Sequence, residues 1–145
     1  MMIYNKKIDW PITLILSLAH IVGLAGTAVY VYFNGIHPVE IVMFAVLYIF
    51  TGLSITAGYH RLYSHRSYES HFLVRLFYMI FGACAIENSV RQWASDHRMH
   101  HKFVDTEQDP YNIKQARWYA HMGWLFTDKS QWGNLDNVKA LEKDP

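Results

Sequence analysis

The chain has 145 residues, of which 52% are hydrophobic and only 17% are charged. Ordinary soluble domains carry about 25% charged residues, so the composition points away from that class. The 13 Lys and Arg nearly balance the 12 Asp and Glu, and the net charge of +1 gives no reason to expect a nucleic-acid partner. The single cysteine, Cys84, excludes a disulfide framework and a metal site built from several thiolates.

Two uncharged runs predict a helical hairpin that crosses a membrane twice. Residues 12–33 carry no charge apart from His20, and residues 41–59 carry none. A helix needs roughly 20 apolar residues to cross a hydrocarbon core, so we place the spans at about 12–33 and 39–59. Lys and Arg are absent from positions 8–60 but flank the pair, which puts both outer ends in the cytoplasm. A buried helical pair in a soluble protein is disfavoured because two such runs rarely fit inside so small a chain.

The third apolar stretch, residues 72–90, is a weaker candidate because Arg75 lies near its start and Glu87 near its end. Histidine clusters flank this stretch, and a full span would separate them by about 30 Å of hydrocarbon. We therefore predict an amphipathic helix lying at the cytoplasmic surface of the membrane. The polar region that follows, 91–128, is predicted to form cytoplasmic helices on either side of a loop at 105–110.

Five of the nine histidines gather in two clusters with the spacing of metal ligands. They are His60, His65, His97, His100 and His101. In the second cluster all three side chains can face one sector of a helix, because positions three and four apart are neighbours. The five-residue spacing of the first cluster exceeds one helical turn, which suits either a helix end that unwinds or two ligands for different metals. Five imidazoles exceed the needs of one tetrahedral zinc ion, so the pattern favours a two-metal centre.

Ligand chemistry narrows the choice of metal without naming it. Neither cluster contains cysteine, which disfavours a zinc ribbon or an iron–sulfur cluster. The His-Glu-x-x-His motif of metalloproteases is absent, and imidazole-rich sites suit Fe, Zn, Cu or Ni. A structural role is favoured for His20, His37 and His71, and a packing or ligand-supporting role for His121.

Three motifs resemble those of membrane fatty-acid desaturases, specifically the acyl-CoA Δ9 (stearoyl-CoA-like) branch. They are HRLYSH at 60–65, QWASDHRMHHKFVDTEQDPYN at 92–112 and HMGW at 121–124. The resemblance extends from about Trp10 to Phe126 and implies an all-α integral membrane enzyme with two non-haem Fe ions. Such enzymes use O₂ and two electrons to introduce a cis double bond into a saturated acyl chain. The resemblance makes all five clustered histidines iron ligands: His60, His65, His97, His100 and His101.

The family also has a third histidine box, H-x-x-H-H, which follows two further spans. This sequence reaches Pro145 without that box, so the resemblance identifies residues 1–145 as the N-terminal half of a desaturase domain. Because only part of the family's ligand set is present, we expect this chain alone neither to hold both irons nor to turn over.

The resemblance also indicates residues that bind the substrate. Four positions match headgroup-contacting or tunnel-shaping residues of animal members: Asn88, Trp93, Asp96 and Lys129. Trp93 matches the tryptophan that shapes the bent acyl tunnel, and residues 72–85 are expected to form part of its wall. Ser95 and Asp128 stand where those members carry basic residues, which leaves open whether the acyl group is carried on CoA, on a lipid or on a carrier protein.

The same resemblance implies partners for the metal centre. Electrons would come from a ferredoxin or from a b-type cytochrome with its reductase. A basic face on which the electron donor docks could include Arg91, Arg98 and Lys102, or these residues could anchor phospholipid headgroups. Ligating histidines usually donate their second N–H to a carboxylate or carbonyl group. Nearby acids that could accept it are Asp96, Asp105 and Asp109.

Two other functions are compatible with this pattern. Related histidine-box membrane enzymes hydroxylate or decarbonylate their substrates, although the contexts H-R-L-Y-S-H and D-H-R-x-H-H-K favour desaturation. A non-enzymatic metal-binding or transport protein would carry polar or acidic residues inside its spans, and only His20 and Glu40 fit that description.

Overall fold

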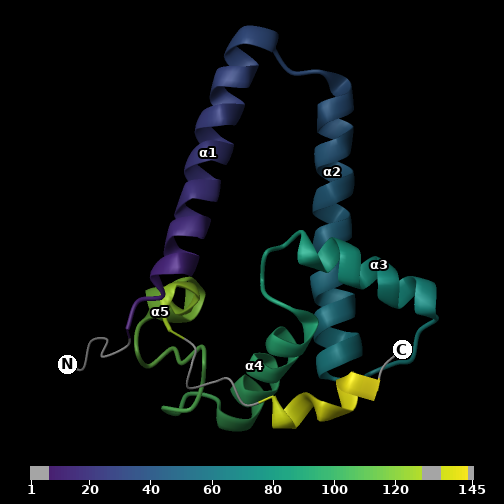
Figure 1. Ribbon diagram of the computed structural model, residues 1–145, viewed down its shortest axis with the longest axis vertical. Coiled ribbons are helices and arrows are strands. Elements are labelled where there is room, and N and C mark those ends of the chain that lie inside the picture. Colours follow the sequence, from purple (N-terminus) through teal and green to yellow (C-terminus); the bar gives the residue numbers. More distant parts are fainter. Residues whose placement is uncertain (1–6, 129–134, 144–145) are drawn as a thin grey trace.

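The computed structural model describes residues 7–128 and 135–143, and within them every regular element is a helix. Figure 1 shows two long helices, α1 and α2, rising from a layer of shorter ones. In chain order the elements are α1 (Trp10–Asn34), α2 (Pro38–Leu53), the π-helix η1 (Ser54–Ser64), α3 (Phe72–Ala83), α4 (Val90–Phe103), α5 (Arg117–His121) and the 3₁₀ helices η2 (Gly123–Phe126) and η4 (Asp136–Lys143). The predicted all-α membrane architecture is confirmed.

Among the described residues, two helices are long and apolar enough to cross a membrane. They are α1 and the continuous helix Pro38–Ser64, and each contains a segment with a mean hydropathy of 2.0. No residue of α1 is buried within the protein, so its apolar surface suits contact with lipid rather than with water. The predicted helical hairpin is confirmed, and its second helix continues beyond the expected end at residue 59 to Ser64.

The turn that joins α1 to α2 is built from residues that suit its backbone. Gly35 has φ 71°, in the left-handed region that glycine adopts without strain. Pro38 occupies the first turn of α2, where its missing N–H costs nothing, and the N–H of His37 donates to Glu40 Oε2 at 2.9 Å. The hydroxyl of Tyr30 donates to Glu40 Oε1 at 2.5 Å, which links the two helices at this end.

At the other end, α1 is attached to the layer of short helices. The carboxylate of Asp9 caps α1 by accepting the N–H of Ile12 at 3.1 Å, and the N–H of Asp9 donates to the carbonyl of Phe126 at 2.9 Å. An antiparallel bridge between Ile8 and Thr127 extends this contact. These bonds hold the start of α1 beside η2, close to α5 in Figure 1.

Helix α3 packs across η1 through a reciprocal pair of contacts between tyrosine and glycine. A Cβ added to Gly58 would lie 2.6 Å from Cγ of Tyr78, and one added to Gly82 would lie 2.4 Å from Cε1 of Tyr59. Each ring therefore occupies space that only a glycine leaves open. Both tyrosines are buried, and with Leu62 and others they form the hydrophobic core of the described chain.

The apolar stretch 72–90 forms a shorter helix than the sequence predicts. Helix α3 ends at Ala83, and a turn follows in which Ile86 and Asn88 have positive φ values of 57° and 80°. Ser89 then caps α4, because its hydroxyl accepts the N–H of Gln92 at 3.2 Å. At about 1.5 Å per residue, the 12 residues of α3 extend only about 18 Å. That is too short to cross a membrane, in keeping with the predicted interfacial position.

The polar region beyond α4 is only partly as predicted. Helix α4 and the loop at 105–110 agree with the sequence, but 111–128 form two short helices, α5 and η2, in place of one longer surface helix. The carboxamide of Asn112 explains part of this difference: its Oδ1 accepts the N–H of Lys114 and its Nδ2 donates to the carbonyl of Thr106, which fixes a turn.

Candidate metal centre

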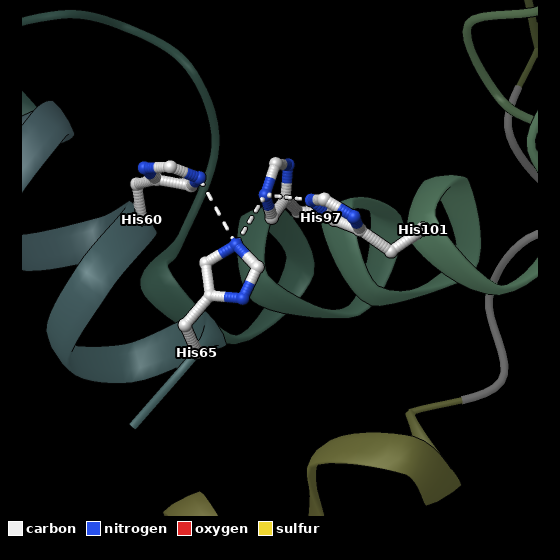
Figure 2. A group of neighbouring side chains, drawn as sticks. All are labelled: His60, His65, His97 and His101. Carbon is white, nitrogen blue, oxygen red and sulfur yellow. Dashed lines mark hydrogen bonds between the residues drawn. The ribbon is translucent and has the colours of Figure 1, made fainter. Parts of the chain in front are cut away.

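Four histidines from two helices converge on one point (Figure 2). His60 lies in the last turn of η1 and His65 directly follows that helix, whereas His97 and His101 belong to α4. One ring nitrogen from each lies within 4.8 Å of the other three. The Nε2 atom of His65 is 3.0 Å from Nε2 of His60 and of His97, and Nε2 of His101 is 3.0 Å from that of His97. The two predicted histidine clusters are thus brought together in space.

The π-helix explains the five-residue spacing of the first pair. In a π-helix the N–H of each residue bonds the carbonyl five positions earlier, and the N–H of His65 donates to the carbonyl of His60 at 3.0 Å. In an α-helix, residues five apart would point about 140° away from each other. The helix therefore widens in place of unwinding, and both imidazoles join the same group of four.

The second pair uses ordinary α-helical spacing. His97 and His101 are one turn apart on α4, as predicted. The ring of Trp93, one turn earlier, stacks on His97 with centroids 4.9 Å apart and planes at 23°. The indole Nε1 of Trp93 donates to Glu87 Oε2 at 2.9 Å. Glu87 was not identified from the sequence as part of the site.

The donor set fits a metal ion better than it fits hydrogen bonding among histidines. A neutral imidazole nitrogen is either a donor or an acceptor, so four nitrogens in a row can satisfy at most two of their three contacts. Burial and the neighbouring histidines lower the pKa of His97 to about 3 and also lower the pKa of His65, which keeps both in the neutral, metal-binding form. Two imidazoles bound at right angles about 2.1 Å from a metal would have nitrogens about 3.0 Å apart.

His100 lies outside this group of four. Its Nδ1 contacts Oδ1 of Asp109 at 2.8 Å, and that carboxylate is fully buried. Asp109 also accepts the backbone N–H groups of Asp105 and Tyr111, each at 2.9 Å. Asp109 thus makes the kind of contact that was proposed for an acid supporting a ligating histidine. His100 instead lines a neighbouring cavity of about 520 Å³, with His97 and Tyr111 among its other walls.

The predicted substrate residues that the structure describes lie in different environments. Trp93 contacts His97, as described above. Asp96 is buried, and its Oδ1 accepts a hydrogen bond from Nε2 of Gln92 at 2.7 Å. Asn88 is exposed in the turn before α4. Ser95 is fully buried and donates to Oδ1 of Asn137 in η4 at 2.8 Å. Lys129 lies outside the described residues.

An apolar cavity of about 540 Å³ lies beside the helical hairpin. Its walls come from one face of α2, from the start of η1 and from Cys84 and Ala85 in the turn after α3, and Glu87 also borders it. The cavity is thus lined by the end of the stretch predicted to form a tunnel wall, but mainly by the second long helix. Glu87 borders both this cavity and the one that contains His100.

The other histidines have local structural roles or face outward. Nδ1 of His20 contacts the carbonyl of Leu16 at 2.7 Å within α1. His37 precedes α2, and His71 caps α3 by accepting the N–H of Leu73 at 3.2 Å. His121 is exposed at the end of α5. The structural roles predicted for the first three are in agreement with these contacts.

Fold and site together define a membrane protein whose described residues form helices and carry a group of four histidines that could hold a metal ion. No protein-family model matches the chain. Among curated proteins, acyl-CoA desaturase 1 of Saccharomyces cerevisiae is 40% identical over 84% of this chain, and a probable acyl-CoA desaturase of Schizosaccharomyces pombe is 46% identical over 86%. The Delta(9)-fatty-acid desaturase fat-7 of Caenorhabditis elegans is 38% identical over 98%.

The chain therefore belongs to the family of membrane acyl-CoA desaturases. It spans 24%, 26% and 43% of the lengths of these three relatives. The relatives are thus much longer than this chain of 145 residues.

Proposed function

We propose that this protein serves in the O₂-dependent desaturation of a saturated fatty acyl chain, with non-haem iron as the cofactor. The observation that carries this proposal is the convergence of both histidine boxes on one point, in a chain similar to acyl-CoA desaturases. An acyl-CoA substrate and the Δ9 position are the choices that the similarity favours.

Four side chains would hold one iron ion: His60, His65, His97 and His101. His100, oriented by Asp109, would serve a second iron together with ligands beyond these five histidines. Bound iron would supply the oxidising power needed to remove hydrogen from an unactivated methylene group, which no protein side chain can provide. These five histidines alone would not complete the ligand set of two irons, so we expect residues 1–145 to be inactive on their own.

The protein's own residues would bind and orient the acyl chain. The apolar cavity beside α2 suits a hydrocarbon chain and excludes water from it. Trp93 stacks on His97 and bonds Glu87, which borders this cavity, so it would position the reacting carbons next to the metal centre. For Asn88, Asp96 and Lys129 we retain the proposed role in binding the substrate headgroup.

The histidine boxes would face the cytoplasm, where a ferredoxin or a b-type cytochrome with its reductase could deliver electrons. Lys and Arg flank the predicted hairpin on that side. Arg91 and Lys102 lie on α4 and are at least partly accessible to solvent, so they remain candidates for contacting an acidic donor.

The test is to express the complete coding sequence in cells that lack their own acyl-CoA desaturase, and to analyse their fatty acids by gas chromatography and mass spectrometry. We expect monounsaturated chains from the wild type, none from His97→Ala, and wild-type amounts from the control His121→Ala. Hydroxylated chains in place of unsaturated ones would identify a hydroxylase. An unchanged product with His97→Ala would refute the assignment of the metal centre.

A further inference from the structure

Arg98 connects the two helices that carry the histidines. It follows His97 directly in α4, but its side chain reaches the last residues of η1. Its Nε donates to the carbonyl of Ser64 and its Nη2 to the carbonyl of Tyr63, both at 2.9 Å. Its Nη1 donates to the carbonyl of Asn137 in η4. One guanidinium group therefore joins α4 to both η1 and η4.

These contacts satisfy a particular need of η1. The last carbonyl groups of a helix have no N–H partner further along the same helix, and they carry the partial negative charge of the helix dipole. A guanidinium is a fixed planar fork of donors, so it can bind two adjacent carbonyls at once where an ammonium cannot. Hydrogen bonds from an ionised donor are also about twice as strong as those between neutral groups.

The position of these bonds bears directly on the metal centre. Ser64 is the residue before His65, and Arg98 is the residue after His97. The two imidazoles must be held with their Nε2 atoms 3.0 Å apart, although they come from positions 32 residues apart in the chain. The bonds from Arg98 to Tyr63 and Ser64 tie the backbones that carry the two rings.

We propose that Arg98 is a positioning residue for the metal centre, which holds the end of η1 against α4 so that His65 stays within ligand distance of His97. This inference rests on the proposed metal-dependent function. It concerns the geometry of the site before any reaction, so metal binding tests it without a measurement of desaturation.

The experiment measures binding of Co²⁺, a metal with a visible spectrum, to the purified 145-residue chain in detergent. Outer residues that support metal ligands typically contribute about 10–100-fold to affinity, and we expect a loss of that size with Arg98→Met, together with an altered Co²⁺ spectrum. Arg98→Lys should lose less, because one ammonium can replace part of the fork.

Two control variants separate positioning from general stability. Arg91→Met removes another α4 arginine, whose Nη2 pairs with Glu142 of η4 at 2.5 Å. Asn137→Ala removes the side-chain bonds between η4 and Ser95 but leaves the carbonyls of Tyr63 and Ser64 in place. Both should bind Co²⁺ with wild-type affinity and spectrum, even if their melting temperatures fall.

Wild-type Co²⁺ affinity and spectrum in a folded Arg98→Met variant would overturn the inference and leave the proposed function standing. An equal loss in the two control variants would also overturn it, because general stability would then explain the effect. If Arg98→Met does not fold, Arg98→Lys decides the question, and an unchanged affinity there is a refutation. Absence of Co²⁺ binding to the wild type would defeat both the inference and the proposed metal centre.

Discussion

The contact between Tyr59 and Gly82 gives a quantitative test of how α3 is held on η1. In the Gly82→Ala variant the new Cβ would lie 2.4 Å from Cε1 and 2.7 Å from Cζ of the Tyr59 ring. Ordinary carbon contacts are about 3.5–4.0 Å long, so ring or helix must move by about 1 Å. Overpacking of this kind lowers the free energy of unfolding by about 1–3 kcal/mol. The higher helix propensity of alanine offsets about 1 kcal/mol of this loss. We expect a net loss of about 1–2 kcal/mol because the reciprocal contact at Gly58 restricts the adjustment.

The assay is thermal unfolding followed by circular dichroism in detergent, with Co²⁺ affinity as a second measurement. Tyr59 also contacts Trp93, with ring centroids 6.1 Å apart, and Trp93 stacks on His97. A displaced Tyr59 should therefore weaken metal binding as well. Gly23→Ala is the matched control, since a Cβ at Gly23 meets nothing within 4 Å, and it should be neutral or slightly stabilising. Equal melting temperatures for the two variants would refute the packing argument.

Three further outcomes follow from the site. Asp109→Asn should reduce the iron content of the complete protein, because the amide holds Nδ1 of His100 less firmly than the carboxylate does. Iron analysis should show a loss that corresponds to about a 10–100-fold lower affinity. An unchanged iron content would contradict the proposed role of Asp109. The metal-free chain should lose stability as pH falls from about 6.5 toward 3, because unfolded histidine binds a proton there that His97, with its pKa lowered to about 3, does not. His97→Gln should flatten that dependence of melting temperature on pH. Tyr30→Phe, which removes the bond to Glu40 at the tip of the hairpin, should leave Co²⁺ affinity unchanged.

The sequence was sufficient to predict the elements that depend on local patterns. The uncharged runs predicted the hairpin because a helix that crosses the membrane needs apolar side chains along its whole length. His97 and His101 were placed on one face because α-helical periodicity applies to any sequence. The spacing of His60 and His65 was a signal for a π-helix, but that helix differs from an α-helix only in which carbonyl each N–H reaches. Side-chain types do not reveal that difference.

The features that the sequence did not reveal depend on turns. Glu87 meets Trp93 only because the chain reverses between α3 and α4, at residues with positive φ. Asp109 was one of three acids that the sequence offered as a partner for a ligating histidine, and it meets His100 through a second reversal, where Asp105 has φ 60°. These positions with positive φ are Ile86, Asn88 and Asp105. None of them is a glycine, and non-glycine residues with positive φ are uncommon, so the sequence does not predict a reversal at these positions. Local patterns therefore located the ligands, whereas tertiary contacts decided which groups support them.

The length of α3 leads to a prediction about topology. Its 12 residues extend about 18 Å, against a hydrocarbon core of about 30 Å, and Arg75 near its start would be costly at the centre of a membrane. The elements on either side of α3 also meet at the histidines, which requires them to share one side of the membrane. Ser67→Cys and Lys114→Cys, each in a Cys84→Ser background, should react with a membrane-impermeant maleimide from the same side, since both positions are exposed. Labelling from opposite sides would refute this topology, and with it a metal centre shared by η1 and α4.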